Sequence, residues 1–240
     1  MQQLREINSF SQIITEAVGY WGKTLRFQIL FSLCYFMVYL GLTYFLFDYY
    51  GILAQIQELS VYFSSHNSAA REKYLEIITS ENFISVSFWM VGVMALLFPL
   101  NLGLFNIYNK MDKNEQVFTS DLFVGFEGSN FFKYFGYALL WGAIYYVCKM
   151  FFILMPVWIL LTLLTGPLIF LEQKSILQAL QLSFKLVINN MRKSISVFLL
   201  AIVGSYCGIF LCGIGLLLTL PFWNAVLYAY YRKLLPVTLG

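Results

Sequence analysis

Long stretches without charge constrain this chain more than any other feature of its sequence. Between Ser194 and Tyr231 there is no charged residue, and between Tyr134 and Phe170 the only one is Lys149. About 20 apolar residues in a helix cross the hydrocarbon layer of a bilayer, which is roughly 30 Å thick, so each stretch is long enough for two crossings. Together with 60% hydrophobic and 11% charged residues over 240 positions, these stretches indicate a polytopic membrane protein.

The whole sequence contains six apolar segments long enough to be spans. They predict an all-α fold with one membrane domain over residues 1–240. Three polar segments share one pattern, in which a hydroxyl residue precedes an amphipathic helix and a basic step leads into a pair of spans. The pattern fits an internal repeat, and it fits equally three independent returns from the cytoplasm that each favour a basic surface helix. The predicted spans are 27–47, 84–107, 131–148, 152–171, 196–212 and 216–232, and the predicted interfacial helices are 6–24, 118–130 and 175–192.

Two polar segments carry local signals of their own. Ser175 followed by Gln178 predicts a capping box at the start of the third interfacial helix. Residues 48–83 form the longest polar connection, and the spacing of Ile52, Ile56 and Leu59 within it is helical. We therefore expect this connection to project from the membrane as two helices.

The distribution of Lys and Arg predicts the orientation. In the six-span arrangement one side of the membrane holds only three of the 15 basic residues, namely Arg71, Lys73 and Lys149. Loops rich in Lys and Arg stay in the cytoplasm, so both termini are predicted to be cytoplasmic. The other twelve basic residues are Arg5, Lys23, Arg26, Lys110, Lys113, Lys133, Lys174, Lys185, Arg192, Lys193, Arg232 and Lys233.

The C-terminal part of the chain resembles a known group of membrane proteins. It reads Ala179-Leu-Gln-Leu-Ser-Phe, then Cys212-Gly-Ile-Gly-Leu-Leu-Leu-Thr-Leu-Pro-Phe, then Tyr230-Tyr-Arg-Lys-Leu. This succession is similar to that of a broad bacterial family of mostly uncharacterised six-helix integral membrane proteins, some described as the membrane domain of glycerophosphoryl diester phosphodiesterases. The match lies mainly in residues 172–234. The resemblance implies a fold and a location in the bacterial inner (plasma) membrane, but no reaction.

The sequence offers little material for catalysis. His66 is the only histidine and lies in the polar connection, and the four cysteines lie in apolar runs without the spacing of metal ligands. Membrane enzymes need acids, bases or nucleophiles, whereas the predicted spans contain no Asp or Glu, and their one Arg is Arg232 at the very end of the last span. We therefore expect no enzyme, no metal and no cofactor. A net charge of +3 is too small to indicate nucleic acid as a partner.

Polar and aromatic residues in the spans have two interpretations each. Asn101 and Asn224 are expected either to line a polar cavity or, more commonly for such residues, to hydrogen-bond between helices. The 24 Phe and 17 Tyr are expected mostly on the lipid-facing surface and in interfacial belts rather than around a ligand. The absence of carboxylates from the spans argues against ion-coupled transport.

Two functions are compatible with these features. The first is a non-enzymatic accessory or scaffold protein that binds membrane lipid, a partner protein or a second copy of itself. For this function Lys185, Arg192 and Lys193 are the expected contacts to anionic lipid head groups. The second is a channel, transporter or exporter subunit for a small or amphipathic solute, whose polar cavity Asn101 and Asn224 would line.

Overall fold

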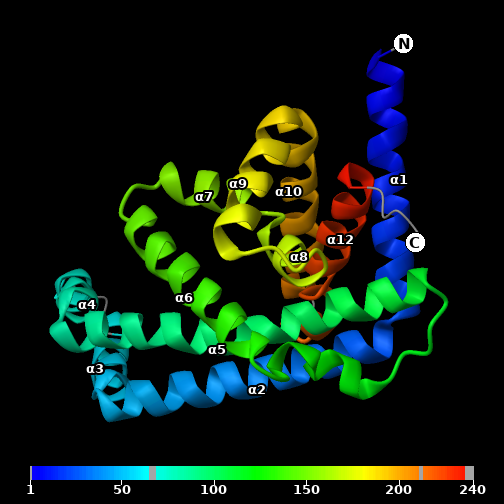
Figure 1. Cartoon of the computed structure of the whole chain (residues 1–240). Coiled ribbons are helices and arrows are strands. Elements are labelled where there is room, and N and C mark those ends of the chain that lie inside the picture. The colour runs from blue at the N-terminus through cyan, green and yellow to red at the C-terminus, as the bar shows by residue number, and fades with distance from the viewer. Residues whose placement is uncertain (1, 65–68, 211–212, 236–240) are drawn as a thin grey trace.

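The computed structural model describes residues 2–64, 69–210 and 213–235, and every regular element in these ranges is a helix (Figure 1). Side chains are described for 10–62, 70–210 and 213–235. Three helical segments are long and apolar enough to cross a membrane: α2 (Leu25–Tyr49), α5 (Glu81–Asp112) and Met191–Phe210. The all-α class is therefore confirmed.

Most predicted segments coincide with helices. The predicted span 27–47 lies within α2, the predicted span 84–107 lies within α5, and the connection 48–83 holds two further helices as expected. The remaining elements are α1 (Gln2–Lys23), α3 (Ile52–Ser64), α4 (Ala69–Thr79), the 3-10 helix η1 (Thr119–Phe126), α6 (Asn130–Cys148), α7 (Leu154–Leu161), α8 (Thr165–Phe170), α9 (Ile176–Asn189), α10 (Met191–Tyr206), the 3-10 helix η2 (Cys207–Phe210), α11 (Leu216–Thr219) and α12 (Phe222–Leu234).

Helix starts follow the local chemistry of hydroxyl residues. The backbone N–H of Gln178 donates to Ser175 Oγ at 3.4 Å, and the backbone N–H of Ser175 donates to Gln178 Oε1 at 3.2 Å. These two bonds confirm the capping box at the start of α9. At the start of α5, Ser80 Oγ accepts a hydrogen bond from the backbone N–H of Phe83 at 3.2 Å.

The second predicted interfacial helix, 118–130, has a different structure. It is the short 3-10 helix η1, which packs directly against α5. The contact depends on glycine, because a Cβ on Gly103 would overlap the backbone carbonyl of Leu122. The buried carboxylate of Asp121 accepts from the backbone N–H of Phe118 at 2.8 Å and pairs with Lys110 Nζ at 2.7 Å. This segment is therefore held by protein contacts and not as an amphipathic surface helix.

Two predicted spans are broken helices. Within 152–171 the chain leaves α7 at Leu161 and resumes helix at Thr165, and Pro167 lies in the first turn of α8, where its missing N–H costs little. Within 216–232, α11 ends at Thr219 and Pro221 directly precedes α12. Neither segment is a continuous helix across its predicted length.

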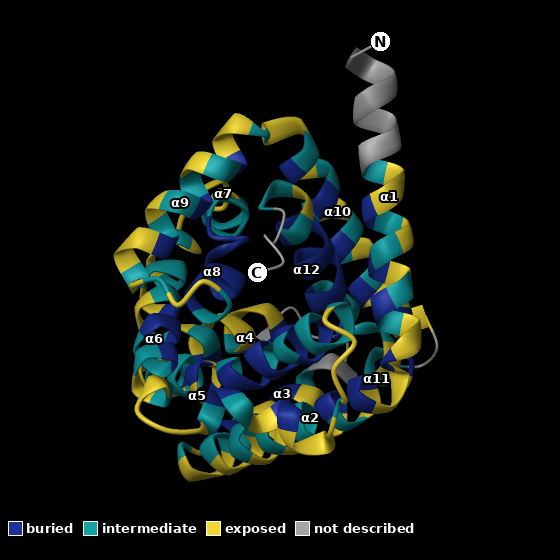
Figure 2. Cartoon of the chain, turned by 45° about the vertical axis from the view of Figure 1, so that its right-hand side comes forward, coloured by how far each residue is buried: buried dark blue, intermediate teal, exposed yellow. Residues whose placement is uncertain are grey.

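The helices run in two main directions. In Figure 1, α2 and α5 lie side by side across the lower part of the molecule, whereas α1, α10 and α12 run upright across them. After the 45° turn to Figure 2, α1 and α10 are still upright. The three apolar segments that are long enough to cross a membrane therefore do not share one axis.

The core is centred on α12, which appears dark blue in Figure 2. All of its residues from Asn224 to Tyr231 are buried. Many Phe and Tyr side chains are exposed, but five tyrosines are among the largest fully buried side chains and belong to this core. These are Tyr108, Tyr134, Tyr228, Tyr230 and Tyr231.

Candidate functional site

The most elaborate polar cluster lies where α1, α5 and α12 meet. The hydroxyls of Tyr20 and Tyr228 donate to the two carboxylate oxygens of Asp112, each at 2.7 Å. Arg232 Nη1 lies 2.8 Å from Asp112 Oδ1 and donates to the hydroxyl oxygen of Tyr20 at 2.6 Å. One residue from each of α1 and α5 and two from α12 thus form a single network.

Both oxygens of the Asp112 carboxylate are bound by partners within the protein. Burial, and next the hydrogen bond to Asp112, raise the pKa of Tyr20 above its ordinary range, so its phenol stays neutral and keeps donating. The rings of Tyr20, Tyr108 and Tyr228 enclose the network, with centroids 5.1 to 5.4 Å apart. The cluster therefore acts as a structural joint.

Further contacts hold α1 along α12. Lys233 Nζ pairs with Glu16 Oε1 at 3.0 Å and donates to Gln12 Oε1 at 3.2 Å. Ile13 and Ala17 on the apolar face of α1 are fully buried. The helix predicted at 6–24 is present, and the protein itself covers much of its apolar face.

The structure brings Asn101 and Asn224 together. Asn224 Nδ2 donates to Asn101 Oδ1 at 3.0 Å, which joins α5 to α12. Asn224 is only 3% exposed. Of the two roles predicted for these residues, the hydrogen bond between helices is the one with a direct contact.

The residues that the sequence predicts to contact lipid head groups lie in two separate places. Lys185 lies on α9 and lines a hollow of about 400 Å³ together with Lys174, Gln178, Gln181 and Leu182. In the described part of the chain, neither Lys174 nor Lys185 forms an ion pair. The hollow is therefore lined by two lysines without an ion-pair partner among the described residues and by two glutamines, a set that suits an anion.

Arg192 and Lys193 do not line this hollow. They lie in the first turn of α10, after the break that Asn190 makes between α9 and α10. Arg192 is exposed and Lys193 is half-buried. They add positive charge near the end of α9 without forming part of the hollow.

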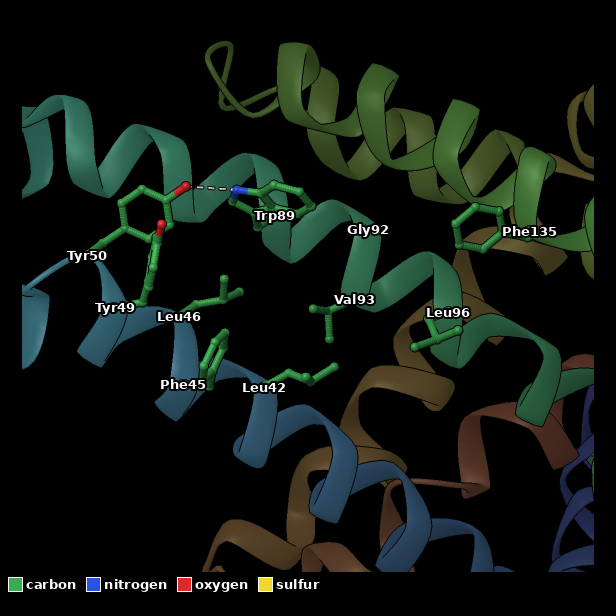
Figure 3. Close-up of a pocket in the computed structure, with 10 residues that line it drawn as sticks. All are labelled: Leu42, Phe45, Leu46, Tyr49, Tyr50, Trp89, Gly92, Val93, Leu96 and Phe135. Carbon is green, nitrogen blue, oxygen red and sulfur yellow. Dashed lines mark hydrogen bonds between the residues drawn. The ribbon is translucent and has the colours of Figure 1, made fainter.

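An apolar groove of about 600 Å³ lies between α2, α5 and α6 (Figure 3). Trp89 and Tyr50 close one end, where the indole Nε1 donates to the Tyr50 hydroxyl oxygen at 2.9 Å. No charged side chain is among its lining residues, so the groove is suited to hydrocarbon. The lining residues are Leu42, Phe45, Leu46, Tyr49, Tyr50, Trp89, Gly92, Val93, Leu96 and Phe135.

Sequence reasoning missed both the Asp112 network and the groove. Asp112 and Arg232 read as two ordinary charges beside the membrane, and nothing in the sequence marked them as a pair. His66 lies outside the described residues. Among the residues that were placed, no three His, Cys, Asp or Glu side chains gather as metal ligands would. Comparison with protein-family models, curated proteins and solved structures gave no match.

Proposed function

We propose that this chain is a non-enzymatic integral protein of the bacterial inner membrane that binds anionic membrane lipid on its cytoplasmic side. The observation that carries the proposal is the α9 hollow, which Lys174 and Lys185 both line without an ion-pair partner among the described residues. Each Lys or Arg near an anionic lipid surface contributes about 1 kcal/mol of attraction. Two lysines in one hollow thus favour an anionic head group by about tenfold or more.

The proposed orientation places both termini in the cytoplasm. It is supported by the strong excess of Lys and Arg in the segments that would be cytoplasmic. It is supported also by the apolar composition of α2 and α5, which lie side by side and are joined by the polar segment that holds α3 and α4. We include in the proposal the six membrane-embedded segments in three units and membership of the bacterial six-helix family, for which the sequence motifs are the support.

The groove beside α2 and α5 adds a second reason to favour lipid. Its lining is apolar, and its closed end carries the Tyr50 and Trp89 pair, residue types that gather at the level of lipid head groups. The transport alternative has less support, because Asn101 and Asn224 bind each other. If the chain binds a partner protein or a second copy of itself, α3 and α4 are the proposed contact surface, because their exposed apolar residues include Ile56 and Leu75.

Native mass spectrometry of lipid retained by the purified full-length protein tests the proposal. The protein would be exchanged into detergent with equal amounts of phosphatidylglycerol and phosphatidylcholine, and retention of the two would be compared. We expect preferential retention of phosphatidylglycerol, reduced about tenfold in the double variant Lys174→Gln, Lys185→Gln. Lys113→Gln is the matched control, since Lys113 is exposed in the linker after α5 and lies outside the hollow. Equal retention of both lipids by the wild type would refute the proposal.

A further inference from the structure

The hairpin made by α10, η2, α11 and α12 meets α2 at the end where α2 begins. Trp21 Nε1, on α1 just before α2, donates to the backbone carbonyl oxygen of Leu218 at 2.8 Å. The Trp21 ring also meets the Phe222 ring edge-on at 6.2 Å. Figure 2 shows α11 beside the lower end of α1. The turn of the hairpin therefore lies near the cytoplasmic end of α2, in the orientation proposed above.

The other contacts of the hairpin also lie in one half of α2 and one half of α5. The helix α11 packs against α2, and Tyr206 at the end of α10 lies near Tyr35, which is about 15 Å along α2 from Leu25. On the other side, α12 bonds to α5 through Asn101 and Asp112, both in the C-terminal half of that 32-residue helix. These contacts place the hairpin beside the cytoplasmic halves of α2 and α5.

The described residues at the tip of this hairpin are apolar and face outward. Phe210 is 91% exposed and Ile214 is 72% exposed, and Ile209 beside them is more than half exposed. No charged residue occurs anywhere in the apolar run that contains them. The far end of α2 is different, because it carries Asp48 in its last turn and leads into the polar segment of α3 and α4. A tip of this composition suits hydrocarbon and not water.

Several backbone groups of the described residues near the tip are hydrogen-bonded within the hairpin. The N–H of Gly213 donates to Ile209 O at 3.2 Å, and the N–H groups of Leu216 and Leu218 donate to residues 213 and 215 at 3.0 Å. Thr219 Oγ1 donates to the carbonyl of residue 205 at 2.8 Å, across the hairpin. Non-helical backbone inside a bilayer needs internal partners of this kind, because lipid tails offer none.

The two arms close tightly because glycine faces glycine. A Cβ on Gly208 would overlap the backbone of Gly215, and a Cβ on Gly215 would overlap Gly208. Small residues of this kind let helices approach closely in membranes. The segment Met191–Phe210 is long enough to cross a bilayer, but it runs across α2 and α5 in Figures 1 and 2 rather than along them.

We infer that the arms 191–210 and 213–234 form a re-entrant hairpin, which enters the bilayer from the cytoplasmic face, turns within the hydrocarbon and returns to the same face. Its tip, defined by Ile209, Phe210 and Ile214, is a surface that contacts the acyl chains of lipid. The inference rests on the proposed orientation, and it replaces the two predicted spans 196–212 and 216–232. Because Arg232 and Lys233 return to the cytoplasmic side, the location of the C-terminus is unchanged.

Cysteine labelling in intact spheroplasts tests the hairpin. In full-length protein with all four native cysteines replaced by serine or alanine, single cysteines would be introduced by Phe210→Cys, Glu72→Cys on α4 and Glu115→Cys in the linker after α5. A membrane-impermeant maleimide should label the Glu72 variant from outside and leave the other two near background. The Phe210 variant should react after detergent solubilisation, which shows that its thiol is competent.

The outcomes separate the hairpin from the orientation on which it rests. Labelling of Phe210→Cys from outside to the same extent as Glu72→Cys would overturn the hairpin and restore two crossings. Labelling of Glu115→Cys but not Glu72→Cys from outside would instead overturn the proposed orientation.

Spin labels at positions 210 and 72 in lipid nanodiscs measure how deep each position lies in the bilayer. The label at position 210 should be accessible to dissolved oxygen, which concentrates in the hydrocarbon, and inaccessible to a water-soluble nickel chelate. Equal exposure of both labels to the chelate would contradict insertion.

Discussion

Arg232 Nη1 lies 2.8 Å from Asp112 Oδ1 and so ties the last helix of the chain to the end of its longest helix. A carboxylate at the C-terminal end of a helix is opposed by the helix dipole. The guanidinium and the phenols of Tyr20 and Tyr228 offset that opposition. The same contacts fix α1 beside α12, so a helix that resembles a free surface helix in sequence is part of the folded unit.

Replacing Asp112 by Asn should loosen α1. The change keeps the shape but removes the charge that the arginine and the two phenols bind, at a cost of about 2 kcal/mol in the free energy of unfolding. The rate of hydrogen exchange at the backbone amides of α1, measured in detergent, should rise as a result. Glu115→Gln is the control: Glu115 is an exposed carboxylate in the linker after α5, and its replacement should leave both quantities unchanged. Equal exchange in the two variants would show that Asp112 does not hold α1.

The pair of Asn101 and Asn224 predicts a coupled response to mutation. Asn101→Leu should lower the free energy of unfolding by about 1 kcal/mol, because the buried Asn224 amide loses its acceptor. The double variant Asn101→Leu, Asn224→Leu should recover part of that loss. A thermodynamic cycle in detergent measures the coupling. Strict additivity of the two changes would argue that the amides act separately, as residues lining a cavity would.

Gly103→Ala should disturb the contact between η1 and α5. The added methyl group would overlap the Leu122 carbonyl, and backbone cannot yield as a flexible side chain does. We expect a loss of at least about 1 to 3 kcal/mol in stability, measured as a lower unfolding midpoint in detergent. Gly41→Ala on α2 is the matched control, since nothing lies within 4 Å of its added Cβ. Similar midpoints for the two variants would contradict the close approach of η1.

Local patterns in the sequence predicted local structure well. The apolar runs predicted α2 and α5, and the pair Ser175 and Gln178 predicted the start of α9. Such features depend on residues a few positions apart, for which helix periodicity and capping are sufficient guides. Where glycine weakened a pattern, as at Gly125 in η1, tertiary packing decided the conformation instead.

Contacts between segments that are distant in the chain could not be predicted from the sequence. Arg232 and Asp112 are far apart in the chain, and charge counting assigns both to the same polar side without pairing them. Length and hydropathy likewise mark Met191–Phe210 as a span, although they carry no information about its direction. The buried tyrosines were missed because a phenol suits both an interfacial belt and a hydrogen-bonded core.

The central claim, anionic lipid at the α9 hollow, is tested most directly by ligand-dependent stability. Short-chain phosphatidylglycerol would be titrated into the detergent-solubilised full-length protein while the unfolding midpoint is recorded, with short-chain phosphatidylcholine as the neutral comparison. A ligand that binds the folded state raises the midpoint in proportion to the logarithm of its concentration. We predict a rise for phosphatidylglycerol in the wild type and in Lys113→Gln, and its loss in the double variant Lys174→Gln, Lys185→Gln. The same rise in the double variant as in the wild type would contradict the claim.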